Sequence, residues 1–323
     1  MKSAGGGELV AAIFLDEAQV EGLLDVESCI AALEDAFREK GEGQAAVLPR
    51  RRLPFQNRRF HLMAASLMRE GWLGYKAYGA ARGQDVMLYK AGEGIVAFIR
   101  SGRLGQVRTG AASGLATKYM ARADATRLGC IGTGNQAETQ VEAVARVRKL
   151  ESISVYGRDP ERRKAFAEKM TGILEQEVRP VATPAEAVRG RDIVITMTNA
   201  AEPVFDGKLL EPGTHVNAAG ANVRINRELD EIAVTRAGMI AVDDLGAAEL
   251  ECGDLAWPIE KGLLSWSKVK ELGDIVAGLM PGRRTPDEIT LFESQGLALE
   301  DVAAARLVYE RALERGIGTP LPF

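Results

Sequence analysis

The sequence LGCIGTGNQA, residues 128–137, decides the fold of this 323-residue chain. Its first four residues predict a short buried strand, and the apolar periodicity that begins at Asn135 predicts a helix over 135–149. Only Gly132, Thr133 and Gly134 lie between the two. A strand that passes through a glycine turn directly into a helix is the start of a βαβ unit.

The residues after this unit continue the alternation of strand and helix. A helix is predicted over 160–170, and further short apolar strands over 153–156, 178–181, 193–196, 215–218 and 239–242. Strands that alternate with helices through short connections form a parallel, doubly wound sheet. We therefore expect a Rossmann domain over residues 123–297.

The residues before the unit follow another pattern. Apolar residues at helical spacing predict helices from Glu17, after the capping Asp16, and over 26–40, and the small-residue run 109–121 is also expected to be helical. Between them lie extended runs separated by glycines, at 47–53, 60–63, 74–78, 86–89 and 95–99. This pattern predicts a smaller α+β domain over 1–122, to which an amphipathic tail helix (299–315) returns, so that 298–323 belong to it.

The glycine turn has the residues that a dinucleotide needs. Gly132 permits the tight turn, Gly134 lets the backbone approach a pyrophosphate, and Ala137 is small enough for close packing of helix on strand. The free N–H groups at the helix start attract the phosphate charge. We expect Thr133, Asn135 and Gln136 to line the same site.

The end of the next strand bears on the choice of nicotinamide cofactor. Enzymes that use NAD usually place Asp or Glu there to bind the ribose 2′-hydroxyl, but this chain has Gly157. Arg158 follows and can pair with a 2′-phosphate, assisted by Arg162 or Arg163. This favours NADP(H). Asp159 turned into the site would instead permit NAD(H).

Composition excludes several classes of function. The 41 basic and 45 acidic residues give a net charge of −4, which offers no global attraction to nucleic acid or to an acidic membrane. Three scattered cysteines make no zinc motif, and we expect no metal, although Glu249, Glu251 and Asp254 resemble a metal cluster by residue type. With neither a signal peptide nor an apolar span evident, we expect a cytoplasmic protein.

Four cations in the first domain stand out from their surroundings in the sequence. Lys76 lies inside an apolar strand, and Arg108 stands before a run of small residues. Arg50 and Arg52 alternate with Arg51, so both fall on one face of a strand. Taken alone, each of these side chains is more often a solvated charge than a functional one.

Spaced motifs across nearly the whole chain resemble the ornithine cyclodeaminase/μ-crystallin family. They are Pro49-Arg50, Leu62 to Ala65, Lys76, Arg108 to Ser113, Gly132 to Ala137, Tyr156-Gly157-Arg158, Val216 to Asn222, Arg227 to Asp230, Glu251 to Leu255, Glu293 to Gly296 and Glu300-Asp301-Val302. Several motifs in the right order are far more specific than any one of them.

The resemblance implies a homodimer that binds a small amino or imino acid. It places Arg50, chosen over Arg52 by strand register, and Arg108 on the substrate carboxylate, and it has Lys76 contact that carboxylate or exchange a proton. Thr109, Thr198, Gly220 and Gly296 would line the cofactor site, and Asn222 the nicotinamide pocket.

Asn222 departs from the family pattern, because the cyclodeaminases and alanine dehydrogenases of the family have aspartate there. Asparagine cannot act as a base. Oxidation of an amine requires removal of a proton, whereas imine reduction starts from a protonated iminium. We therefore expect an NAD(P)H-dependent ketimine reductase acting on a small cyclic 2-imino carboxylate. The alternatives are an ornithine cyclodeaminase or alanine-type dehydrogenase, and an NADPH-dependent binding protein with little turnover.

Overall fold

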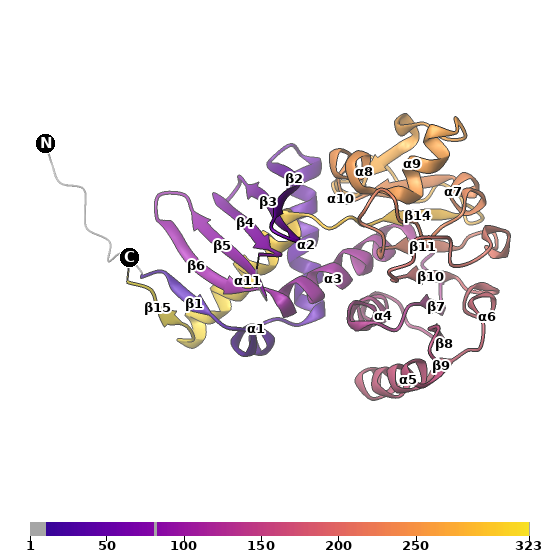
Figure 1. Cartoon of the computed structure of the whole chain (residues 1–323), viewed down its shortest axis with the longest axis horizontal. Helices are drawn as coiled ribbons and strands as arrows, with labels where there is room; N and C mark the ends of the chain where they lie inside the picture. Colours follow the sequence, from indigo (N-terminus) through magenta and orange to yellow (C-terminus); the bar gives the residue numbers. More distant parts are fainter. Residues whose placement is uncertain (1–10, 81–82, 323) are drawn as a thin grey trace, which may run out of the picture.

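The computed structural model describes residues 11–80 and 83–322 and contains two sheets (Figure 1). A seven-stranded sheet has the order β15-β1-β6-β5-β4-β3-β2, and an eight-stranded sheet has the order β13-β12-β14-β11-β10-β7-β8-β9. All neighbours in the second sheet are parallel. In the first sheet β1 and β6 are parallel and the other described pairs are antiparallel. The expected α/β class, a Rossmann sheet beside a smaller α+β unit, is confirmed.

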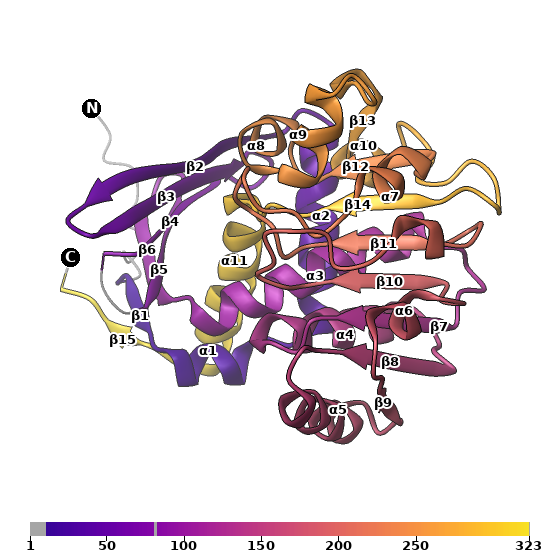
Figure 2. The same ribbon diagram turned by 45° about the vertical axis from the view of Figure 1, so that its right-hand side comes forward.

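The parallel sheet and its helices form the right-hand part of the molecule in Figure 2. Its strands are β7 (Arg127–Ile131), β8 (Ser152–Tyr156), β9 (Val178–Pro180), β10 (Ile193–Thr196), β11 (His215–Ala218), β12 (Met239–Val242), β13 (Val269–Glu271) and β14 (Thr290–Glu293). Its helices are α4 (Asn135–Val147), α5 (Pro160–Leu174), α6 (Pro184–Val188), α7 (Glu231–Arg236), α8 (Leu245–Glu251), α9 (Gly253–Glu260) and α10 (Leu272–Val276), with short 3-10 turns at Gly207–Leu209 and Trp266–Lys268.

Burial on both faces explains why the central strands of this sheet are largely apolar. Along β10, Val194 packs into a core with α6, α7 and α9, whereas Ile193 and Ile195 pack into another with α4 and α5. The chain leaves β7 outward through β8 and β9, then returns to build β10 and β11 on the other side. The order of strands thus reverses at β7, which is where open α/β sheets bind ligands.

The other sheet carries its helices on one side. Its strands are β1 (Ile13–Leu15), β2 (Ala45–Phe55), β3 (Arg58–Leu67), β4 (Trp72–Tyr78), β5 (Gln84–Lys90), β6 (Gly94–Arg100) and β15 (Thr319–Pro320). The helices are α1 (Glu17–Leu23), α2 (Val26–Gly41), α3 (Gly102–Met120) and α11 (Ala298–Arg315). The tail helix α11 packs against α2, α3, β3 and β4, so the end of the chain lies on the first sheet (Figure 1).

Several elements differ from the sequence prediction, among them helix α3 and strand β14. Helix α3 begins at Gly102, not near residue 109 as predicted, because its first N–H groups are capped from a distance. The Glu17 carboxylate of α1 accepts hydrogen bonds from the backbone of Gly102 and Arg103 at 2.7 and 2.9 Å. Strand β14 was not predicted, and it inserts between β11 and β12.

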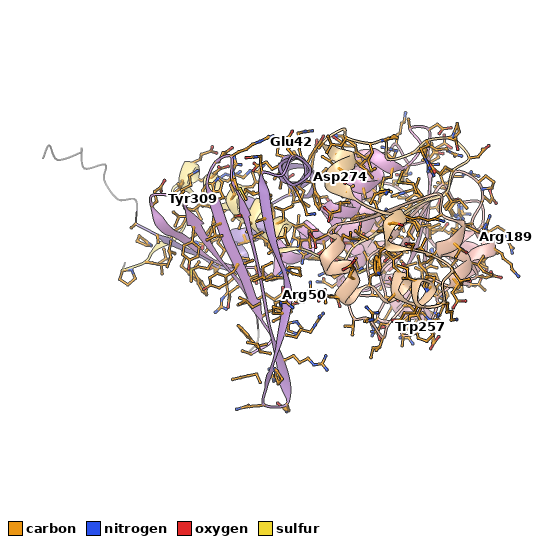
Figure 3. All side chains as sticks on the ribbon, turned by 90° about the horizontal axis from the view of Figure 1, so that it is seen from above. Glu42, Arg50, Arg189, Trp257, Asp274 and Tyr309 are labelled. Atoms are coloured by element: carbon orange, nitrogen blue, oxygen red, sulfur yellow. The ribbon has the colours of Figure 1, made fainter. Side chains whose placement is uncertain are left out.

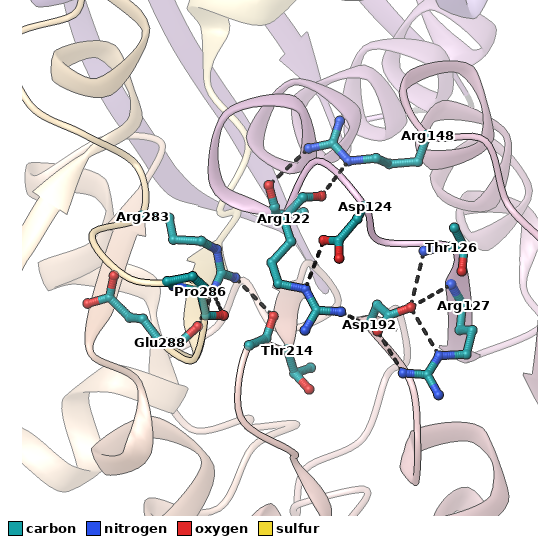
Figure 4. A network of polar contacts seen from close by, with 12 residues as sticks. Arg122, Asp124, Thr126, Arg127, Arg148, Asp192, Thr214, Arg283, Pro286 and Glu288 are labelled. Atoms are coloured by element: carbon teal, nitrogen blue, oxygen red, sulfur yellow. Dashed lines mark hydrogen bonds and ion pairs between the residues drawn. The ribbon is translucent and has the colours of Figure 1, made fainter.

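The amino ends of the parallel strands are tied together by a polar network, drawn in Figure 4. Asp192, just before β10, accepts hydrogen bonds from the side chains of Arg122 and Arg127. Arg148 donates to the carbonyls of Thr117 and Ala121 at the end of α3. The opposite, carboxyl edge of the sheet is therefore the one left for ligands.

In the described part of the chain, no helix has the length and apolar character to cross a membrane. Cys29, Cys130 and Cys252 are free and buried.

Candidate functional site

A cleft of about 730 Å³ lies along the carboxyl edge of the parallel sheet, at the ends of β7, β8 and β10. Ten residues predicted for cofactor binding line it: Gly132, Thr133, Gly134, Asn135, Gln136, Gly157, Arg158, Asp159, Thr198 and Gly220. Ala137 lies fully buried beneath the turn. Sequence reasoning missed a group of lining residues from the loop after β10, namely Met197, Asn199, Ala200, Pro203 and Val204.

The glycine turn has the shape that a pyrophosphate requires. Gly132 has φ +125°, and a Cβ on it would lie 2.1 Å from the carbonyl oxygen of Met197. A Cβ on Gly157 would lie 2.3 Å from Thr133 Oγ1. No side chain caps helix α4, whose N-cap is Gly134. Its first N–H groups therefore remain available to an anion.

The arginines at the far end of the cleft, at the end of β8, differ in whether they face the cleft. Arg158 and Arg162 line the cleft and are exposed. Arg163 is held away from it, since its Nη1 donates to the carbonyl of Gly157 at 2.9 Å and its guanidinium lies over the Tyr156 ring. One oxygen of Asp159 caps helix α5, accepting from the N–H groups of Glu161 and Arg162.

A second cavity, of about 230 Å³, meets the cleft at Gln136, Met197 and Gly220. It lies between the two sheets, and Figure 3 shows Arg50 at this boundary. The predicted residues Arg50, Lys76, Arg108, Thr109, Asn222 and Gly296 all line it, together with Met63, Tyr78, Gln84, Gly105, Ala219, Ser294 and Gln295, which were not predicted. Thr109 and Gly296, predicted for the cofactor, thus lie on the smaller cavity.

Two buried cations share one carboxylate oxygen at the wall of this cavity. Lys76 Nζ and Arg108 Nε donate to Asp301 Oδ1, at 2.8 and 3.2 Å. The side chains of Lys76 and Asp301 are 2% and 1% exposed. Burial, reinforced by Arg108 and Arg50, lowers the pKa of the Lys76 amine despite the opposing charge of Asp301. Asp301 itself has a lowered pKa, because the charges of Arg108 and Lys76 outweigh its burial.

Arg108 is also held by Glu300, the neighbour of Asp301 in the first turn of α11. Arg108 Nη1 donates to Glu300 Oε2 at 2.7 Å. Burial and the nearby Asp301 charge raise the pKa of Glu300 to about 6, against the pull of Arg108. Among the described residues Arg108 Nη2 has no hydrogen-bond partner, so this nitrogen is the one available to a ligand.

Arg50 and Arg52 share the carboxylate of Glu251, at the end of α8. Arg50 Nη1 donates to one oxygen of Glu251 and Arg52 Nη1 to the other. Arg52 Nη2 also donates to the carbonyl of Asn222 at 2.9 Å. Glu251, one of the three residues that resemble a metal cluster by type, is thus a partner of arginines that joins β2 to the Rossmann domain.

The turn at Gln295 and Gly296 is held from both sides. Arg50 Nη2 donates to both carbonyls, at 3.0 and 3.2 Å, and Asp243 accepts both N–H groups, at 2.7 and 2.6 Å. Burial raises the pKa of Asp243 well above its usual range. Both terminal nitrogens of Arg50 are therefore engaged in building the cavity wall.

Asn222 lines the cavity from the loop after β11, and none of the described lining residues is a carboxylic acid. Glu251, Glu300 and Asp301 stand behind the arginines and Lys76 and are paired with them. The cavity thus presents positive charge and hydrogen-bonding groups, and no described carboxylate that could accept a proton directly from a ligand.

Partners of the predicted residues were harder to find from sequence. Glu251, Glu300 and Asp301 lie in motifs that were noticed, but residue type alone does not say which cation each one meets. Their signal was an acidic residue beside apolar neighbours: Glu300 and Asp301 are fully buried in the structure.

The chain resembles known proteins over its length. The model of the ornithine cyclodeaminase/mu-crystallin family matches residues 10–316. A Delta(1)-pyrroline-2-carboxylate reductase of Bacillus cereus is 42% identical over 236 residues, which are 73% of this chain and 72% of that protein. An alanine dehydrogenase of Archaeoglobus fulgidus is 33% identical over 324 residues, covering 96% of this chain and 98% of that one.

A solved structure has the same fold. It is that of Thermococcus litoralis Delta(1)-pyrroline-2-carboxylate reductase in complex with NADH and L-proline, which is 36% identical, has a TM-score of 0.91 and covers 96% of this chain and 100% of its own. The residues that line both cavities fall within the matched range of the family model. The chain belongs to the ornithine cyclodeaminase/mu-crystallin family and is a nicotinamide-dependent oxidoreductase.

Proposed function

We propose that this enzyme reduces the C=N bond of a small cyclic 2-imino acid, such as 1-pyrroline-2-carboxylate, to the corresponding amino acid. The observation that carries the proposal is the pair of buried cations, Lys76 and Arg108, on a cavity of about 230 Å³ that opens into the cofactor cleft. The names of the Bacillus and Thermococcus relatives support the same substrate class.

Arg108 and Lys76 bind the substrate carboxylate. Arg108 offers Nη2, while its other nitrogens are fixed by Glu300 and Asp301. Lys76 has three donors, of which Asp301 takes one. Charge-assisted hydrogen bonds of this kind are strong and directional, so they fix the imine carbon relative to the cofactor cleft. Arg50 supports this wall through the 295–296 turn.

The reaction needs one hydride and one proton. When bound, the reduced nicotinamide supplies the hydride that the imine carbon accepts. The proton is the one that converts the imine nitrogen to the iminium before hydride arrives, and Lys76, whose amine has a lowered pKa, can donate it. Asn222 can hydrogen-bond the nitrogen but cannot remove a proton from it, which suits reduction better than amine oxidation.

A second candidate is an alanine-type dehydrogenase or a cyclodeaminase, which the match to the archaeal alanine dehydrogenase over nearly the whole chain favours. Both reactions begin by oxidising an amine and need a base. Asn222→Asp supplies a carboxylate at this place, so it should raise amine oxidation relative to imine reduction. An unaltered ratio would remove Asn222 from the argument.

The test is a panel of substrates with NADH and with NADPH. Cyclic 2-imino acids of five- and six-membered rings should be reduced, whereas L-alanine and L-ornithine should react far more slowly. Lys76→Met should abolish turnover, and Lys118→Met, on the exposed face of α3, should not. Ammonia release from ornithine without net NADH would establish a cyclodeaminase. Ligand binding without turnover of any member would establish a binding protein.

We propose NADP(H) as the preferred cofactor. Arg158 and Arg162 line the cleft at the end of β8, where a 2′-phosphate would lie, and Asp159 already caps α5. Replacing both arginines by alanine should lower kcat/KM with NADPH by at least about tenfold, since each charged pair is worth roughly 1 kcal/mol or more. The value with NADH should stay nearly unchanged, and a parent enzyme that prefers NADH would refute the assignment.

We also propose a homodimer joined through the outer face of the seven-stranded sheet. Leu73 on this face is 49% exposed. Its neighbours form a continuous aromatic and apolar surface, with Tyr75 beside Tyr89 and Phe14 beside Phe98. A solved relative is described as an alanine dehydrogenase dimer. Light scattering should give twice the chain mass, and Leu73→Glu should reduce it.

We infer a cytoplasmic location, because three free buried thiols suit a reducing compartment. Fractionation of the source cells would test this location.

A further inference from the structure

Glu228 belongs to the Arg227–Asp230 motif, which lines neither cavity, and it is fully buried. Its carboxylate accepts four hydrogen bonds. Oε1 accepts from the N–H and the hydroxyl of Thr198, both at 2.6 Å, and Oε2 accepts from the Thr196 hydroxyl at 2.9 Å and the N–H of Gly220 at 2.8 Å. Thr198 and Gly220 lie on different loops, so one side chain joins the loop after β10 to the loop after β11.

The backbone of Glu228 is engaged as well. Its N–H donates to Asp254 at 2.8 Å, and its carbonyl accepts from the N–H of Val204 at 2.8 Å. Val204 lines the cofactor cleft. The loop from Met197 to Val204 is therefore fixed by Glu228 at both of its ends.

These loops border the half of the cleft beyond the glycine turn. The adenosine end lies at Gly157 and Arg158, and the glycine turn holds the pyrophosphate, so the nicotinamide half extends the other way, to Met197, Thr198 and Gly220. This is where the cleft meets the substrate cavity. The placement rests on the function proposed above.

We propose that Glu228 is a positioning residue that sets the place of the nicotinamide half of the cofactor, acting through Thr198 and Gly220. The turn at Gly220 is closely packed, since a Cβ there would lie 2.4 Å from the carbonyl oxygen of Thr198 and 2.6 Å from Glu228 Oε1. Burial raises the pKa of Glu228, and the four donors oppose that rise. Because each oxygen faces a backbone N–H, the site needs an acceptor atom at both positions, which a carboxyl group supplies and an amide does not.

Glu228→Gln keeps the shape and removes this match. Whichever way the amide is turned, its NH₂ faces a backbone N–H, either that of Thr198 or that of Gly220. One buried N–H then loses its acceptor, which corresponds to a loss of about fivefold or more in an equilibrium that depends on the loops. Glu202→Gln is the matched control, because Glu202 lies on the same loop but is exposed.

The experiment measures two affinities by titration calorimetry on the full-length protein, for NADH and for ADP-ribose, which lacks the nicotinamide. Glu228→Gln should weaken NADH binding at least about fivefold and leave ADP-ribose binding unchanged, while Glu202→Gln changes neither. NADH binding equal to that of the parent, or an equal loss for both ligands, would overturn the proposal.

If Glu228→Gln does not fold, Thr196→Val takes its place. It removes one hydroxyl donor to the carboxylate without touching either cavity, and the same contrast between NADH and ADP-ribose decides the outcome. Neither affinity involves the imine. A parent that binds NADH but reduces no imino acid therefore refutes the proposed reaction and leaves this inference standing.

Discussion

Replacing Asp192 by asparagine should destabilise the Rossmann sheet while leaving catalysis unchanged. The Asp192 carboxylate accepts from Arg122 Nη2 at 2.7 Å, from Arg127 Nη2 at 2.8 Å, and from the backbone N–H groups of Thr126 and Arg127 (Figure 4). Burial raises its pKa, but the donors led by Arg127 outweigh it and hold the pKa at about 2, against 3.8 for a free side chain. This difference corresponds to roughly 2.4 kcal/mol of stability.

The dependence on pH follows from the sign of the shift. Because folding lowers the pKa, the stabilisation is complete above the unfolded value and is lost as the pH falls through the folded value of about 2. At pH 3 about half of it remains. Asp192→Asn should therefore lower Tm at pH 7 by about 3 to 4 °C, and the difference from the parent should shrink towards pH 3.

The matched control is Asp124→Asn. Asp124 is 82% exposed and pairs with the same Arg122, so its loss should scarcely change Tm. Thermal unfolding followed by circular dichroism supplies the values, and imine reduction at 25 °C supplies the kinetic check. The reasoning is refuted if Asp192→Asn has the same Tm as Asp124→Asn, or if its decrease in Tm relative to the parent is the same at pH 3 and pH 7.

Two further predictions concern the substrate cavity. Gly296→Ala should raise KM for the imine several-fold, because the added Cβ would lie 2.8 Å from Arg108 Nη1. Gly278→Ala is the matched control: its φ of +76° is nearly that of Gly296, +77°, but no atom lies within 4 Å of the added Cβ, so kinetics should be unchanged. Asp301→Asn removes the negative charge that raises the Lys76 pKa against burial, so that pKa should fall further. The alkaline limb of the pH profile of kcat/KM for the imine should then move to lower pH. If the limb does not move, it does not report the titration of Lys76.

The cofactor cleft was predictable because its signal is local. Gly132, Gly134 and Ala137 act through backbone conformation and size, which the sequence states directly. Lys76 and Arg108 were also predictable, as charges that stand out among apolar or small residues. All of these predicted residues reached one of the two cavities except Ala137, which packs beneath the turn.

The partners of those residues depend on tertiary structure and could not be predicted. Glu251 meets Arg50 and Arg52 from about 200 residues away, as the sequence separations of 201 and 199 show. The start of α3 depends likewise on Glu17, a cap that lies on another helix. No local pattern fixes such pairs, because residues far apart in sequence meet only in the tertiary structure.

The return of α11 to the first sheet has a chemical consequence. Its first turn places Glu300 and Asp301 directly behind Arg108 and Lys76, where the helix N-terminus favours negative charge. Four cations, Lys76, Arg50, Arg52 and Arg108, then face three paired carboxylates, those of Glu251, Glu300 and Asp301. Glu300 has a pKa of about 6 and Asp301 has a lowered pKa, so both are ionised at neutral pH. The four cations outnumber the three carboxylates by one charge. A substrate with a single carboxylate neutralises that charge, whereas a dicarboxylate would add an unpaired anion. Net charge therefore favours the monocarboxylic imino acids on which the proposed function rests.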